Sequence, residues 1–150
     1  MIRYFTEDTS FSLKGKRLIS KWLRQVAREN GHTVGELNYI FCSDPYLLAI
    51  NQQFLDHDYY TDIITFDNSD DYFQETGKLG VSADIYISID TVRANGDVYG
   101  EGFDRELDRV IVHGLLHLVG YDDVTEWKRR RMRAVENRAL KLLDAIRAGE

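Results

Sequence analysis

Cysteine and proline are nearly absent from this sequence of 150 residues, which contains one of each, Cys42 and Pro45. A single cysteine excludes an intramolecular disulfide and a cysteine-based zinc ribbon, so a bound metal must use His, Asp or Glu as ligands. No stretch approaches the roughly twenty apolar residues of a membrane-spanning helix, and the N-terminal MIRYFTEDTS lacks the basic and apolar segments of a secretory signal. We therefore expect a cytoplasmic protein that does not associate with a membrane.

An excess of positive charge is also missing, since the formal net charge is −6 and the sequence pI is about 5.2. This charge argues against a protein that coats nucleic acid through bulk attraction. A nucleic-acid function would need a local basic patch, and the run KRRRMR at 128–133 offers one. The ordinary alternative for such a run is a solvated helix face.

The chain also lacks internal repeats, low-complexity segments and Pro/Gly-rich linkers, which favours one domain over residues 1–150. Apolar residues recur at helical spacing in some segments and alternate or cluster as in strands in others. Helices are expected near 13–30, 45–54, 107–118 and 135–146, strands near 2–5, 37–42, 63–66 and 84–89, and a mobile polar loop at 67–80. This order predicts a single-domain α+β fold with about four strands in a mixed sheet covered by about five helices.

The stretch HGLLHLVGYDD, residues 113–123, carries the strongest functional signal. His113 and His117 are four residues apart, so on a helix they project from one face and can reach one ion. Gly120 can end the helix in a left-handed conformation, which lets the chain turn back and present one of the two aspartates that follow. The pattern predicts a metal site at the end of a core helix. The alternative is a buried helix whose histidines are satisfied by their neighbours.

The same stretch resembles the HGxLHLxGYDH signature of the YbeY family, bacterial metal-dependent endoribonucleases that take part in ribosomal RNA maturation and ribosome quality control. Two further segments add to the resemblance: TDIITFD at 61–67 is similar to the family's TDVLSFP strand, and SADIYIS at 82–88 to its GDI strand. Asp62 and Asp84 within these segments are expected to have structural roles. The resemblance covers nearly the whole chain.

The resemblance implies that His113 and His117 bind zinc, and it places Asp123 where the family has its third histidine. A carboxylate oxygen can replace an imidazole nitrogen at a similar distance from zinc, but the site becomes harder and more negative. One Zn²⁺ per chain is therefore expected, with Mn²⁺ or Fe²⁺ as possible replacements. Asp122 is the second choice for the third ligand, or it orients an imidazole from outside the coordination shell. We assign catalysis to His113, His117 and Asp123, with the bound water as nucleophile or base.

Many family members carry an arginine, thought to hold substrate phosphate, shortly before the TDVLSFP strand, and the best register puts Leu55 there. His57 lies nearby, and Arg109, one turn before His113, can reach toward the site. A surface histidine and an ion-paired arginine are the ordinary interpretations of these two residues. The basic run supplies the other predicted RNA contacts, at Lys128, Arg129, Arg130, Arg131 and Arg133.

These inferences predict a single-strand-specific metal-dependent endoribonuclease, a hydrolase that processes the 3′ end of small-subunit rRNA and acts in ribosome quality control. Its expected partners are rRNA and the ribosome or small-subunit proteins. The alternatives are a ribosome-assembly factor in which the metal only stabilises the fold, and another metal-dependent phosphoester hydrolase. A HExxH metalloprotease is disfavoured because Gly114 stands where the glutamate would be, and an iron(II) oxygenase because its ligands normally come from barrel strands.

Overall fold

The computed structural model describes residues 1–55 and 61–149 and shows one four-stranded sheet. The strands are β1 (Ile2–Glu7), β2 (Val34–Cys42), β3 (Ile63–Asp67) and β4 (Val81–Ser88). Their order is β1-β2-β4-β3, in which β1 and β4 run parallel to β2 and β3 runs antiparallel to β4 at one edge. The described helices are α1 (Lys16–Glu29), α2 (Asp44–Leu55), α3 (Ser69–Thr76), α4 (Ile89–Tyr99), α5 (Phe103–Leu118) and α6 (Glu126–Ala148). The predicted α+β fold with a four-stranded mixed sheet is confirmed.

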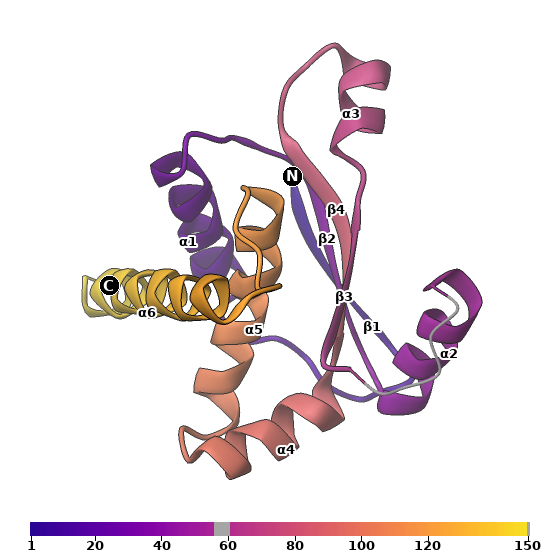
Figure 1. Cartoon of the computed structure of the whole chain (residues 1–150), viewed down its shortest axis with the longest axis vertical. Coiled ribbons are helices and arrows are strands. Elements are labelled where there is room, and N and C mark those ends of the chain that lie inside the picture. Colours follow the sequence, from indigo (N-terminus) through magenta and orange to yellow (C-terminus); the bar gives the residue numbers. More distant parts are fainter. Residues whose placement is uncertain (56–60, 150) are drawn as a thin grey trace.

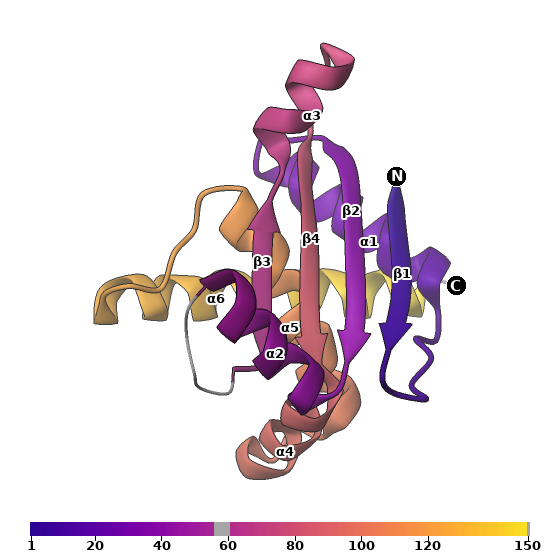
Figure 2. The same ribbon diagram turned by 90° about the vertical axis from the view of Figure 1, so that its right-hand side faces the viewer.

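The helices cover the two faces of the sheet unequally. α1, α5 and α6 lie on one face, and α2 lies on the other (Figure 1). Viewed onto that second face, α2 covers the lower part of the sheet, below α3 (Figure 2). The main core therefore lies between the sheet and the first group of helices, and a smaller cluster of Cys42, Leu47 and Ile64 lies under α2.

The two faces of the sheet differ because successive side chains along a strand point to opposite faces. In β4, every second side chain is buried against the helices of the main core, namely Val81, Ala83, Ile85 and Ile87. The side chains between them point to the opposite face, where Asp84 and Tyr86 are half-buried. A strand with one apolar and one more polar face is what the sequence pattern predicts here.

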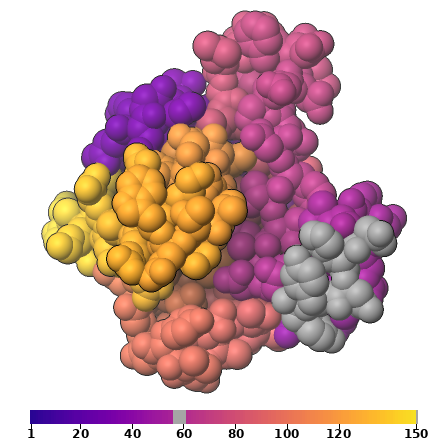
Figure 3. All heavy atoms as spheres, in the orientation of Figure 1, coloured from indigo at the N-terminus to yellow at the C-terminus, as the bar shows by residue number. Residues whose placement is uncertain are grey.

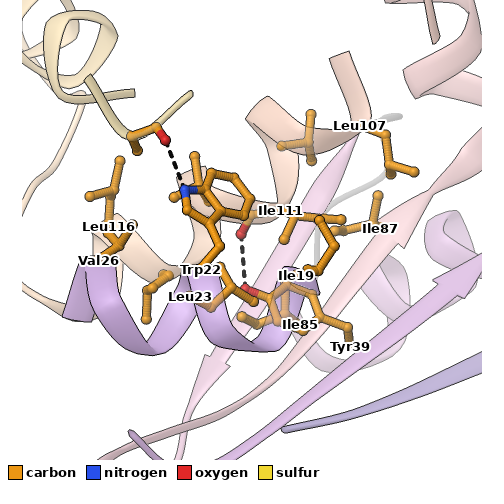
Figure 4. Close-up of a cluster of buried hydrophobic side chains, with 14 of the residues drawn as sticks. Ile19, Trp22, Leu23, Val26, Tyr39, Ile85, Ile87, Leu107, Ile111 and Leu116 are labelled. Carbon is orange, nitrogen blue, oxygen red and sulfur yellow. Dashed lines mark hydrogen bonds between the residues drawn. The ribbon is translucent and has the colours of Figure 1, made fainter. Parts of the chain in front are cut away.

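Two side-chain hydrogen bonds inside the main core tie the layers together (Figure 4). The Trp22 indole of α1 donates to the carbonyl oxygen of Ala139 in α6 at 2.8 Å. The Tyr39 hydroxyl of β2 donates to the carbonyl oxygen of Ile111 in α5 at 2.9 Å. Because both donors are buried and paired, they fix α6 against α1 and α5 against the sheet.

Two described helices, α3 and α4, lie where the sequence patterns located none, and the described residues contain six helices where about five were expected. The segment 67–80, expected to be a mobile loop, contains α3, which buries none of its residues and so has no apolar stripe to detect. α4 begins directly after β4, where the strand was expected to continue to Ile89. The Ser88 hydroxyl accepts a hydrogen bond from the Thr91 amide at 3.2 Å, which caps the new helix.

α6 is the longest described helix, with 23 residues, and most of its surface is charged. Neither α6 nor any other described helix combines the length and the apolar character that crossing a membrane requires.

Candidate metal centre

α5 carries both predicted histidine ligands and packs on β3 and β4. Gly114 faces the strands so closely that an added Cβ would lie 3.1 Å from Ile63 Cδ1 and 3.2 Å from Ile85 Cγ2. This close approach sets the distance between α5 and the strands β3 and β4. It therefore also sets the position of His113, the residue before Gly114.

The chain reverses direction directly after α5. Gly120 has a φ of 110°, a conformation that other residues rarely adopt. The Tyr121 amide then donates to the Leu116 carbonyl oxygen at 3.0 Å, and the Tyr121 hydroxyl donates to Asn30 Oδ1 at 2.9 Å. This reversal brings Asp123 back beside the end of the helix, as the position of Gly120 predicts.

The three predicted ligands meet at the end of α5. The Nε2 atoms of His113 and His117 lie 3.0 Å apart. Asp123 Oδ2 lies 3.7 Å from His113 Nε2, and Asp123 Oδ1 lies 3.8 Å from His117 Nε2. The side chains of His113, His117 and Asp123 are 20%, 32% and 45% exposed, so the group is open to solvent on one side.

These positions fit one metal ion. Donors held about 2.0–2.1 Å from a tetrahedral ion lie roughly 3.3 Å from one another. The two imidazole nitrogens are 3.0 Å apart, and the three donor atoms, one from each residue, all lie within 4.8 Å of one another, so small side-chain rotations reach this spacing. Two imidazole nitrogens and one carboxylate oxygen suit Zn²⁺, Mn²⁺ or Fe²⁺. Three protein ligands leave a fourth tetrahedral position for water or substrate.

A buried carboxylate contacts the His113 ring on the side that faces away from the other two donors. Glu136 Oε2 lies 2.6 Å from His113 Nδ1, and its side chain is only 6% exposed. Arg109 donates to Glu136 Oε1 at 3.2 Å and to Asn137 Oδ1 at 2.9 Å. Because an ionised carboxylate only accepts hydrogen bonds, Glu136 keeps a proton on His113 Nδ1 and leaves Nε2 free to face the other two donors.

The two histidines differ in their pKa. Burial lowers the pKa of His117, and the nearby His113 lowers it further. Burial also acts to lower the pKa of His113, but the hydrogen bond and charge of Glu136 outweigh it, so this pKa is raised. His117 is therefore neutral near pH 7 and offers a free lone pair.

Asp122, the second choice for the third ligand, has other partners. Its Oδ1 accepts from the Val124 amide at 3.2 Å, and its Oδ2 accepts from Lys128 Nζ at 3.1 Å. These two hydrogen bonds lower the pKa of Asp122. Among the described residues, Asp123 is the carboxylate whose oxygen joins the two histidines in a group able to hold an ion.

The position of the family's phosphate-binding arginine and its two candidate replacements come from different parts of the chain. Arg109 is buried and bound to Glu136 and Asn137, with Glu101 3.4 Å away, which agrees with the ion-paired interpretation. Leu55 is the last residue of α2 and is exposed. His57 lies outside the described residues.

The basic run lies on α6, on the outer surface beside the segment around β3 (Figure 3, orange and magenta). Two of its side chains form salt bridges, Lys128 with Asp122 and Arg130 with Glu126. Arg129 donates hydrogen bonds to the carbonyl oxygens of Asp123 and Val124. Arg131 lies over two aromatic rings. Arg133 lines a cavity of about 200 Å³ that Asp62 and His113 also line. Asp62 is close enough to interact with His113, and burial raises its pKa.

Sequence reasoning missed Glu136. The residue lies on the buried face of α6, at helical spacing from Met132, Ala139 and Leu140. A carboxylate is almost never fully buried without a partner, so a glutamate inside an apolar stripe was the available signal.

The fold and these side chains define a class of protein: a single-domain α+β protein with a candidate two-histidine, one-carboxylate metal centre at the end of a central helix. The family described as Endoribonuclease YbeY matches residues 2–144. The chain belongs to this family, which confirms the resemblance seen in the sequence and supports an endoribonuclease role.

Individual relatives agree over nearly the full length. A protein of Cytophaga hutchinsonii named Endoribonuclease YbeY is 49% identical over 141 residues, which are 94% of each chain. One of Phocaeicola vulgatus with the same name is 46% identical over 143 residues, covering 95% of this chain and 99% of the relative. The solution structure of TM1509 from Thermotoga maritima has a TM-score of 0.64 at 26% identity and covers 95% of this chain and 89% of its own.

Proposed function

We propose that this chain is a metal-dependent, single-strand-specific endoribonuclease that processes the 3′ end of small-subunit rRNA and acts in ribosome quality control. Zn²⁺ is the proposed ion, one per chain, with Mn²⁺ or Fe²⁺ as alternatives because Asp123 supplies a hard oxygen ligand. The proposed partners are rRNA and the ribosome or small-subunit proteins, and the proposed place of action is the cytoplasm. Family membership and the three-donor group support this proposal.

The convergence of His113, His117 and Asp123 on one open point carries the proposal. The three donor atoms, one from each residue, lie within 4.8 Å of one another, so the group could hold one ion, and the side chain of Asp123 is still 45% exposed. A purely structural zinc site is closed by four protein ligands, whereas a catalytic site keeps a position open. The exposed side gives a polymeric substrate access to the open position.

The chain's own residues prepare the site for phosphodiester hydrolysis. An ion bound there would polarise a phosphoryl oxygen and supply an activated water near neutral pH. Glu136 holds His113 in the required orientation, and Arg109 offsets the buried charge of Glu136. Arg133, which makes no salt bridge to any described residue, is available for a substrate phosphate beside His113.

A cleavage assay on a labelled small-subunit rRNA 3′ precursor tests the proposal. Wild-type protein is stripped of metal and then resupplied with Zn²⁺, Mn²⁺ or Fe²⁺. His117→Ala removes one donor, and His32→Ala serves as a matched control because His32 is an exposed histidine outside the site. We expect metal-dependent cleavage by the wild type and by His32→Ala, and its loss in His117→Ala.

Three results would contradict the proposal or a part of it. Cleavage that persists in metal-free protein would separate the activity from the three donors. No cleavage by folded, metal-loaded protein, alone or with ribosomes, would favour the assembly-factor alternative. Cleavage of a duplex as fast as of the single strand would remove the proposed substrate preference.

A further inference from the structure

An exposed tryptophan lies at the beginning of α6. Trp127 is 64% exposed, whereas Trp22, the other tryptophan of the chain, is fully buried in the main core. An indole of this size gains free energy when it leaves water, so a ring left open on a surface is a candidate contact for a ligand. Trp127 follows Asp123, the carboxylate of the candidate metal centre, by four residues.

Trp127 is one end of a row of three side chains. The Arg131 guanidinium carbon lies 5.7 Å from the centre of the Trp127 ring and 5.0 Å from the centre of the Tyr121 ring. Both distances are in the range of cation–π contacts. Tyr121 is in turn held by its hydrogen bond to Asn30. The row therefore supports the Trp127 ring from one side without covering it.

The charges around the ring favour a nucleic acid as its ligand. Three arginines of the same run form no salt bridge with any described residue, namely Arg129, Arg131 and Arg133. Arg131 lies against the ring, and Arg129 and Arg133 lie on the same helix. A nucleotide offers a base for such a ring and a phosphate for the nearby cations. Arg129 also donates to the carbonyl oxygen of Asp123 at 3.4 Å, which ties this surface to the metal-centre loop.

We propose that Trp127, supported by Arg131 and Tyr121, stacks one nucleobase of single-stranded RNA beside the metal centre. A duplex cannot occupy the platform in this way because its bases are already stacked on one another. The platform therefore gives a physical basis for single-strand preference, and it rests on the proposed function. Stacking on an aromatic face depends little on base identity, so the platform accepts all four bases.

Intrinsic fluorescence isolates this contact because only one of the two tryptophans is exposed. Metal-stripped protein is titrated with a six-nucleotide oligouridine and, separately, a six-nucleotide oligoadenosine, so that binding is read without cleavage. We expect both oligonucleotides to quench the emission of Trp127. In Trp127→Ala the dissociation constant, followed by the anisotropy of a labelled oligonucleotide, should rise about tenfold.

Two variants separate stacking from a general loss of apolar surface. Trp127→Phe keeps an aromatic face and should retain most of the affinity. Val124→Ala removes an exposed side chain on the loop just before α6 and should leave the affinity unchanged. Thermal unfolding of each variant checks that the fold is intact.

The outcomes distinguish this proposal from the function it rests on. Wild-type binding with equal affinity in Trp127→Ala and no quenching would overturn the platform but leave the nuclease proposal standing. No binding of any single strand by the wild type would overturn both. A shift in Trp127 emission with anionic phosphatidylserine vesicles, but not with RNA, would overturn the platform by assigning the ring to a membrane surface.

Discussion

At the scale of single residues, the candidate metal centre depends on a side chain that does not face the ion. Glu136 contacts His113 on the nitrogen that points away from the other two donors. If Nδ1 lost its acceptor, the imidazole could carry its proton on Nε2 and would then be unable to donate that lone pair to a metal. The buried carboxylate therefore decides which form of His113 is available.

Replacing Glu136 by Gln should weaken Zn²⁺ binding by about 10–100-fold, because a neutral amide holds the His113 tautomer less firmly and removes the buried charged partner of Arg109. Competition with a chelating dye measures the affinity. Glu101→Gln is the matched control, since Glu101 also lies beside Arg109 but is 39% exposed and does not contact His113. Equal zinc affinity in wild type and Glu136→Gln would show that the hydrogen bond does not serve the metal centre.

The residues of the site differed in how far the sequence could reveal them. His113 and His117 followed from helical spacing, because both lie on one unbroken helix. The choice between Asp122 and Asp123 stayed open, because either residue can face back after a turn at Gly120. The competing interaction of Asp122 with Lys128 joins a loop to the first turn of α6, a contact that local patterns do not specify.

At the scale of elements, the helices with strong apolar stripes were predictable, and two of the helices without one were not. α1 and α5 bury a well-defined face, and their periodicity showed it. α3 buries nothing, and α4 buries only Ile89, Val92 and Gly96, so neither gives a clear stripe. The Ser88 hydroxyl caps the beginning of α4, and Gly77 ends α3 in a left-handed conformation. Periodicity reports neither feature.

Gly96→Ala should destabilise the protein even though alanine favours a helix more than glycine does. A Cβ at position 96 would lie 2.8 Å from the carbonyl carbon and oxygen of Gly102, and the backbone between α4 and α5 would have to shift. Overpacking of this kind costs about 1–3 kcal/mol, which exceeds a propensity gain of about 1 kcal/mol.

Denaturant titration measures the free energy of unfolding. Val98→Ala, at a 74% exposed position of the same helix, should stay close to wild type, and a Gly96→Ala protein of unchanged or higher stability would refute the close-packing argument.

At the scale of the whole molecule, the apolar core and the metal centre are built separately. The main core joins the sheet to α1, α5 and α6, and His113, His117 and Asp123 are not among its residues. Layering was predictable from the alternation of strands and helices, but the strand order was not. Pairing β4 between β2 and β3 requires contacts between segments distant in sequence.

Removing the metal should therefore lower stability without unfolding the chain. We expect chelated protein to keep its far-ultraviolet circular dichroism and to melt cooperatively, because the core needs no ion to form. Adding Zn²⁺ at about a hundred times its dissociation constant should stabilise the folded state by about 2.7 kcal/mol, or roughly 5–10 °C in Tm for a chain of this size. His117→Ala should melt near the chelated wild type and show little response to Zn²⁺. An unfolded chelated wild type would contradict this separation and would make the metal structural, as in the assembly-factor alternative.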